Sequence, residues 1–139
     1  MTIGVMMIQT EYDLFNYLRN IIPDLTASPN PYSVYDCWSK RFNMYVELKC
    51  RRTHYDKLLI EYSKYQRLVT TAFLGRYVPY YVCSTPNGVF AFNLINHSPE
   101  WVSELMPATT FGNQTKIPKM IGYLHTSEAE KIWELPILR

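Results

Sequence analysis

Two carboxylates and a lysine lie close together in the first third of the chain. Asp36 is followed, after ten intervening residues, by Glu47, Leu48 and Lys49 within the segment SVYDCWSKRFNMYVELKCRR. Such a trio can hold a divalent metal and position a water molecule for attack on a phosphodiester. The spacing alone also arises by chance. The strict apolar–polar alternation around Glu47 adds weight, because it predicts a strand that presents Glu47 and Lys49 on one face.

The chemistry follows from the residue types. Mg²⁺ prefers oxygen ligands, so we expect it to bind the carboxylates of Asp36 and Glu47 and the backbone carbonyl of Leu48. Mn²⁺ is expected to substitute for it. An ammonium group at Lys49 would orient or help deprotonate the attacking water and stabilise charge on the phosphate.

A structural explanation stays open beside the catalytic one. Tyr45, Glu47, Lys49 and Arg51 are also what the solvated face of an edge hairpin looks like. Asp36 fits that explanation poorly. It interrupts an apolar and aromatic run, where an ionised group needs a partner or a metal.

The elements that must position these residues form an α/β pattern, with a mixed central β-sheet flanked by helices. The helix at 53–69 would carry Tyr55, Tyr62 and Tyr65 in its apolar stripe, with core packing expected and contact with bases as the alternative. The expected elements are a helix over 11–22 capped by Thr10, a hairpin of strands 33–39 and 43–51, a helix over 53–69, strands 76–85 and 88–94, a short helix over 99–105, a loop over 107–116, a strand over 119–125 and a terminal helix over 128–133.

Length and composition favour one ordered domain over residues 1–139. The chain is 47% hydrophobic and 19% charged, which argues against disorder. Three cysteines without a C-x-x-C pair fit a reducing compartment. No signal peptide and no membrane span is recognised, so a cytoplasmic, intracellular protein is expected. The apolar residues within 132–138 would cover the core or a dimer surface.

Charge is distributed unevenly. The segment 36–76 contains nine lysines and arginines and four acids, although the net charge of the whole chain is only +2. A local basic surface predicts a polyanionic partner, with ordinary solvated lysines as the alternative. For Lys116 and Lys119 the alternative is a role in capping the loop. The residues expected to contact DNA are Arg51, Arg52, Lys57, Lys64 and Arg67, together with Lys116 and Lys119.

Over roughly residues 11–94 the sequence resembles the PD-(D/E)xK nuclease superfamily, which includes restriction enzymes, Holliday junction resolvases and small phage nucleases. The resemblance implies a restriction-endonuclease-like core, metal binding by Asp36 and Glu47, and catalytic assistance by Lys49. It also implies a further acidic residue on the first helix, with Glu11 the best candidate and Asp13 second. A polar residue on the later helix would be Glu61, Lys64 or Gln66. No proline precedes Asp36, which departs from the family pattern.

The leading interpretation is a magnesium-dependent DNA endonuclease that acts on branched or damaged DNA, phage-encoded or resolvase-like. One site cuts one strand, so a homodimer is expected. Two alternatives are a catalytically inactive nuclease-fold module that binds DNA or a host protein, and an unrelated α/β protein that acts by protein contact. Histidine and cysteine spacing argues against structural zinc, and the chain has no Walker loop.

Overall fold

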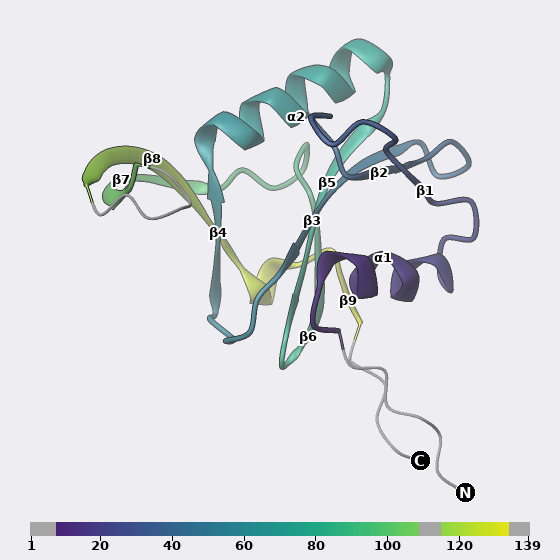
Figure 1. The fold of residues 1–139 in the computed structure, drawn as a ribbon, viewed down its shortest axis with the longest axis horizontal. Helices are drawn as coiled ribbons and strands as arrows, with labels where there is room; N and C mark the ends of the chain where they lie inside the picture. Colours follow the sequence, from purple (N-terminus) through teal and green to yellow (C-terminus); the bar gives the residue numbers. More distant parts are fainter. Residues whose placement is uncertain (1–7, 109–114, 134–139) are drawn as a thin grey trace, which may run out of the picture.

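The computed structural model describes residues 8–108 and 115–133, without the side chains of 131–133. Two β-sheets and two α-helices form the described part of the chain (Figure 1). The six-stranded sheet has the order β1-β2-β3-β5-β6-β9, and the three-stranded sheet has the order β4-β8-β7. The helices are α1 (Glu11–Arg19) and α2 (Tyr62–Gly75), and the strands are β1 (Thr26–Ala27), β2 (Cys37–Ser39), β3 (Met44–Cys50), β4 (Lys57–Glu61), β5 (Val78–Thr85), β6 (Gly88–Asn93), β7 (Glu100–Pro107), β8 (Lys116–His125) and β9 (Lys131–Trp133).

The six-stranded sheet is mixed, as the sequence predicted. Strands β2 and β3 form the expected antiparallel hairpin, and β5 and β6 form a second one. Strand β3 pairs with β5 in parallel, with Glu47 opposite Tyr81. A parallel neighbour requires a crossover connection, and β4 with α2 supplies it. The two hairpins are therefore joined side by side at the centre of the sheet.

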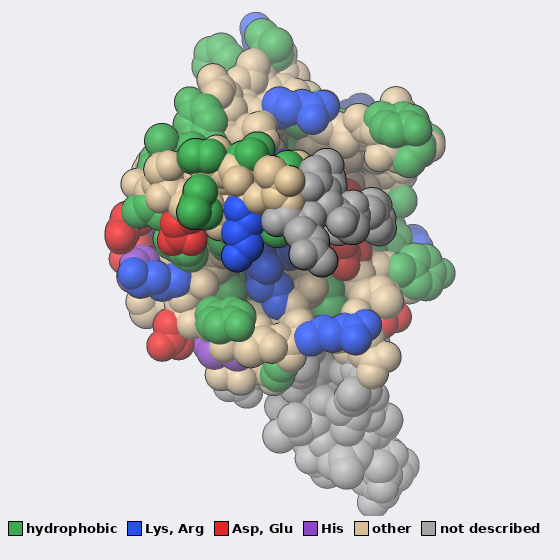
Figure 2. Space-filling view, turned by 60° about the vertical axis from the view of Figure 1, so that its left-hand side comes forward, with side chains coloured by type: hydrophobic (Ala, Val, Ile, Leu, Met, Phe, Trp, Pro, Cys, Tyr) green, Lys and Arg blue, Asp and Glu red, His purple; other side chains and the backbone are tan. Residues whose placement is uncertain are grey.

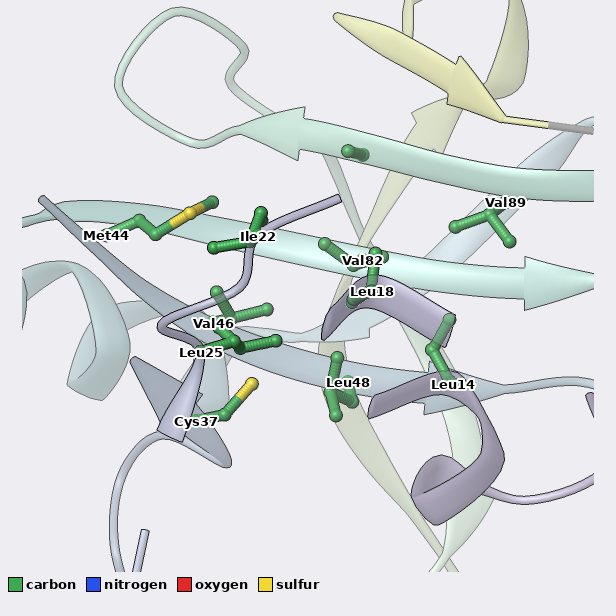
Figure 3. Close-up of a cluster of buried hydrophobic side chains, with 11 residues drawn as sticks. Leu14, Leu18, Ile22, Leu25, Cys37, Met44, Val46, Leu48, Val82 and Val89 are labelled. Atoms are coloured by element: carbon green, nitrogen blue, oxygen red, sulfur yellow. The ribbon is translucent and has the colours of Figure 1, made fainter. Parts of the chain in front are cut away.

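Helix α1 covers one face of this sheet. Its N-terminus has a capping box: the Thr10 hydroxyl accepts a bond from the Asp13 N–H, and the Asp13 side chain accepts one from the Thr10 N–H. Leu14 and Leu18 lie on one side of the helix and pack on β3 and β5 (Figure 3). The even-numbered residues Met44, Val46 and Leu48 of β3 all point into this cluster. Alternation along the strand then directs Tyr45, Glu47 and Lys49 to the opposite face.

Helix α2 and the second sheet cover that opposite face. The core there joins Leu58 and Ile60 of β4, Leu68 of α2, and residues of β5 and β6 such as Phe92. Because both faces of the central strands are covered, β5 and β6 are buried almost throughout. Glu47 thus lies on a sheet face that is covered by protein. In an exposed edge hairpin, the same face would contact solvent.

The second sheet extends away from this core. Strand β4 pairs only with residues 121–125 of β8, whereas residues 116–120 pair with β7 alone. Figure 1 shows the β7–β8 pair as an arm that extends to the left of the body. The far half of the arm is a two-stranded ribbon, with Leu105 and Met120 exposed.

Three helix predictions were wrong. Residues 57–61 of the predicted helix 53–69 are strand β4, and α2 begins only at Tyr62 and runs to Gly75. Leu58 and Ile60 are buried and alternate with more exposed residues, as expected of a strand. Pairing with β8 holds this segment in the extended conformation. Residues 100–107 form β7 where a helix over 99–105 was predicted. Residues 131–133 form β9, after a single 3₁₀ turn, in place of a terminal helix.

Smaller differences concern ends and loops. The first helix ends at Arg19 and the first hairpin strand begins at Cys37, so Asp36 directly precedes the strand. Strand β7 runs through Pro107 and β8 begins at Lys116, so Lys116 lies on a strand and not in a loop, while Lys119 lies on a strand as predicted. The rest of the predicted loop, residues 109–114, and the apolar tail from residue 134 lie outside the described residues. No helix in the described segments is long and apolar enough to cross a membrane.

Candidate metal and nucleic-acid site

The β2–β3 hairpin positions Asp36 beside the Glu-Leu-Lys segment. The backbone N–H of Asp36 donates to the carbonyl of Val46 at 2.9 Å, which extends the hairpin pairing by one step. Its carboxylate Oδ2 accepts a bond of 2.7 Å from the N–H of Leu48. The preceding residue is held as well, because the rings of Tyr35 and Tyr45 stack with centroids 4.1 Å apart. Asp36 is therefore fixed by contacts on both its backbone and its side chain.

Glu47 lies next to Asp36 on the sheet face beneath α2. Its side chain is 16% exposed. Loss of hydration raises the pKa of Glu47 to about 7, and the charge of Asp36 adds to the effect. The pKa of Asp36 is also raised, chiefly by loss of hydration, while its bond from Leu48 opposes the rise. The two carboxyl groups thus share a site where negative charge is incompletely compensated.

This donor set fits a divalent cation. The N–H and C=O of one strand residue point to the same side, so the Leu48 carbonyl faces the side of Asp36, as its N–H does. Two carboxylates and one carbonyl are oxygen ligands of the kind that Mg²⁺ prefers. Within the described residues no group of three or more His, Cys, Asp and Glu is arranged to hold a metal. The Leu48 carbonyl and water would therefore have to complete the coordination.

The first helix brings one acidic residue toward the pair. The charge of Glu11 raises the pKa values of both Asp36 and Glu47, which places this exposed residue within electrostatic reach of them. Asp13 has another role, because its Oδ2 accepts the N–H groups of Gln9 and Thr10. Of the two candidates on α1, Glu11 is the one free of the helix cap.

Two lysines approach the carboxylates. Lys49 shares the strand face of Glu47 and lowers its pKa. Lys64, on the first turn of α2, places its Nζ 3.8 Å from Glu47 Oε2 and also lowers the pKa of Asp36. Of the three residues proposed for the later helix, Lys64 is thus the one next to the carboxylates. Glu61, at the N-cap of α2, accepts from Lys119 Nζ at 3.3 Å, and Gln66 lines a separate groove beside Val34.

A cavity of about 250 Å³ opens over these groups. Besides Glu47, Lys49 and Lys64, its walls include Tyr81 and Met106, which the sequence analysis did not identify. Tyr81 reaches the cavity because β5 pairs in parallel with β3, and Met106 reaches it from the far half of the β7–β8 arm, where it pairs with Ile117. No local pattern in the sequence signals either contact. A cavity with both charged and apolar walls therefore adjoins the Glu-x-Lys face.

Arg51 is held inside the protein rather than displayed on it. Its Nη2 donates to the Leu59 carbonyl at 3.0 Å, and the Tyr81 hydroxyl donates to the same oxygen at 3.0 Å. The Arg51 Nε is buried without a hydrogen-bond partner. These bonds tie the six-stranded sheet to β4. Arg51 thus braces the two sheets and lines the cavity at the same time.

The other predicted DNA-contact residues are spread over the surface. Arg52 is exposed beside Thr85 and Pro86, and Arg67 is exposed on α2. Lys57 is on β4 and not on a helix, with its Nζ 5.9 Å from the centre of the Tyr123 ring. In Figure 2, which brings the arm side of Figure 1 forward, lysine and arginine side chains lie in the middle of the face and at several places around it, with acidic ones among them. Contact of any of them with DNA stays a prediction.

Comparison with known proteins shows the fold. No family model and no curated protein matches the sequence. Among solved structures, the chain is similar to Hjc of Archaeoglobus fulgidus, a Holliday junction resolvase from an archaeal hyperthermophile. The TM-score is 0.54 at 16% sequence identity, over 89% of this chain and 87% of the other. The likeness shows the fold alone, and that fold agrees with the expected restriction-endonuclease-like core.

Proposed function

We propose that this chain, which has a restriction-endonuclease-like fold, is a metal-dependent endonuclease that hydrolyses phosphodiester bonds in branched DNA. The observation that carries the proposal is the convergence of Asp36 and Glu47, with Lys49 on the same face. The preference for branched DNA rests on the similarity to a Holliday junction resolvase. The fold on its own supports many activities, so the site residues have to carry the chemistry.

Each residue then has a defined task. Asp36, Glu47 and the Leu48 carbonyl would hold Mg²⁺ or Mn²⁺, with Glu11 within electrostatic reach of both carboxylates. The bound cation would polarise the scissile phosphate and lower the pKa of a water molecule. Lys49 orients that water and stabilises the charge that develops on the phosphate. Lys64, beside Glu47, adds positive charge where the phosphate must approach.

The raised pKa of Glu47 supports this assignment. A carboxyl group with a pKa of about 7 in the metal-free protein is a site where a cation is electrostatically favoured. Asp36 and Glu47 would both be in their charged form when they hold a divalent ion, because the ion would compensate their negative charge. In an ordinary solvated hairpin face, each carboxylate would be hydrated and nothing would require a cation.

The direct test is cleavage. Labelled four-way junctions, flaps, single strands and linear duplexes of matched sequence are incubated with the protein and Mg²⁺ or Mn²⁺. We expect cleavage of branched substrates that EDTA abolishes. Asp36→Asn and Glu47→Gln should each reduce the rate by at least about a thousandfold, because both ligands act as a unit. The matched control is Glu128→Gln, an exposed residue outside the site, which should cleave at the wild-type rate.

Two outcomes would contradict the proposal. Cleavage that persists in the Glu47→Gln variant would show that Glu47 is not part of the catalytic site. Salt-dependent binding of branched DNA without cleavage in any metal would favour the alternative, a catalytically inactive module with a nuclease fold. Cutting both strands needs two sites, so we also propose a homodimer on the substrate, which light scattering on the protein–junction complex tests directly.

A further inference from the structure

A second cavity adjoins the catalytic one. It has a volume of about 550 Å³ and opens on the outer face of β4 and β8, where it is lined by Arg51, Tyr55, Asp56, Lys57, Leu59, Glu104 and Tyr123. Arg51 and Leu59 also line the cavity that contains Glu47 and Lys49. The two cavities therefore share a wall, made by the side chain of Arg51 and the residue whose carbonyl it holds.

The lining has the chemistry of a nucleobase site. Tyr55 presents a ring that is 61% exposed, and Tyr123 presents a second ring with Lys57 beside it. Any nucleobase can stack on such rings, because every base has a flat aromatic face. The hydroxyl of Tyr123 donates to Glu104 Oε1 at 2.9 Å, which fixes the orientation of both groups.

The polar groups at the edge match a base better than a phosphate. The carboxylates of Asp56 and Glu104 would repel a phosphate, but they accept hydrogen bonds from the amino groups and ring N–H groups of a base. Lys57 donates to a ring nitrogen or a carbonyl. The volume is in the range of small-ligand pockets and is large enough for one base and its sugar.

From this arrangement we infer that the second cavity receives an unpaired nucleobase next to the phosphate that is cut. A nucleotide whose phosphate lies over Glu47 and Lys49 has its neighbour within reach of the shared Arg51 wall. A base inside an intact duplex is stacked and paired, so it cannot enter the cavity without first leaving the helix. The selected substrates are therefore DNAs with an unpaired nucleotide at the branch or in a bulge. The position of the cut rests on the proposed function, whereas the base pocket does not.

Binding tests the pocket without relying on cleavage. In EDTA, the affinity of the protein is measured for a duplex that carries one unpaired nucleotide, for the same duplex with an abasic residue at that position, and for the fully paired duplex. Stacking of one base on an aromatic side chain predicts that the abasic and fully paired duplexes bind about tenfold more weakly. With 2-aminopurine as the unpaired base, its fluorescence should fall on binding.

Variants test whether residues of the cavity cause the preference for an unpaired base. Tyr55→Ala should remove the preference for the unpaired base, because Tyr55 is exposed and its ring contributes to the pocket rather than to the core. Lys57→Ala should weaken the preference less. The matched control is Tyr32→Ala, which removes an 87% exposed ring outside the cavity and should leave the preference intact.

The possible results separate the two proposals. A base-dependent affinity that Tyr55→Ala abolishes, in a protein that never cleaves, would sustain the pocket and refute the nuclease proposal. Metal-dependent cleavage with equal affinity for the unpaired-base, abasic and paired duplexes would refute the pocket and leave the nuclease proposal standing. Equal loss in Tyr32→Ala and Tyr55→Ala would also refute it.

Discussion

The carboxylate of Asp36 accepts a 2.7 Å hydrogen bond from the backbone N–H of Leu48, the residue between Glu47 and Lys49. This bond crosses the β2–β3 hairpin and sets the distance between the two acids. It holds a second negative charge beside Glu47, whose pKa is raised chiefly by burial and further by this charge. The hairpin thus places two carboxylates in one site, where we propose that a divalent cation would relieve their repulsion.

Removing the charge of Asp36 should lower the pKa of Glu47. In Asp36→Asn the amide oxygen still accepts from Leu48, while the repulsion disappears. We therefore expect the pKa of Glu47 to fall part of the way from about 7 toward its ordinary value, because burial, the larger cause of the rise, remains. Carbon-detected NMR titration of the Glu47 carboxyl measures it. A pKa that does not move would mean that the two groups do not interact.

The metal-free protein should lose stability as the pH rises through the range of Glu47. Its folded-state pKa of about 7 lies above the ordinary 4.5, so the folded protein binds more protons than the unfolded chain in between. The free energy of unfolding should fall by on the order of 2 kcal/mol between pH 4.5 and pH 7.5 from this group. Urea unfolding in EDTA measures the change, and Glu47→Gln should remove most of it.

Divalent metal should reverse that loss. At pH 7.5, Mn²⁺ or Mg²⁺ is expected to bind the folded protein and not the unfolded chain. The melting temperature should therefore rise with metal concentration and keep rising above the dissociation constant. The Glu47→Gln variant should show no rise below millimolar metal. A rise of the same size in that variant would place the cation elsewhere on the protein.

Lys64 should weaken metal binding in the resting protein. Its ammonium group is 3.8 Å from Glu47 Oε2 and occupies the surroundings that a cation needs. Because the lysine is 55% exposed, the effect should be modest. We expect Lys64→Met to tighten Mn²⁺ binding by about threefold to tenfold in calorimetry. Lys64→Arg keeps the charge and should leave the affinity close to that of the wild type.

Arg51 should contribute more than Arg52 to the free energy of unfolding. Arg51→Ala breaks the bond to the Leu59 carbonyl that joins the two sheets, and it should lower the free energy of unfolding by about 1–3 kcal/mol. Arg52 is exposed, and Arg52→Ala should change stability by less than about 0.5 kcal/mol. Denaturant unfolding of both variants compares them. Equal stabilities would contradict the role of Arg51 as a brace.

The strand and hairpin predictions that proved correct depended on short-range patterns. Alternation fixes which side chains of β3 share a face, and the short turn between β2 and β3 leaves an antiparallel hairpin as the simple connection. The Thr10 cap was equally readable, because its partner Asp13 is three residues away. Asp36 could be singled out because an acid in an apolar run needs a partner, and that partner was within the same hairpin.

The predictions that failed depended on distant partners. Residues 57–61 satisfy both a helical and a strand pattern, and the choice was made by pairing with β8, about sixty residues further along the chain. Pairing with β8 likewise made residues 100–107 a strand, and pairing with β6 did so for residues 131–133. The β4–β8 pairing placed Lys57 on a strand instead of a helix. Sequence alone thus determined the Glu-x-Lys face and its hairpin. The parallel pairing of β3 with β5 and the docking of the second sheet decided that this face is covered, because burial depends on contacts that no local pattern encodes.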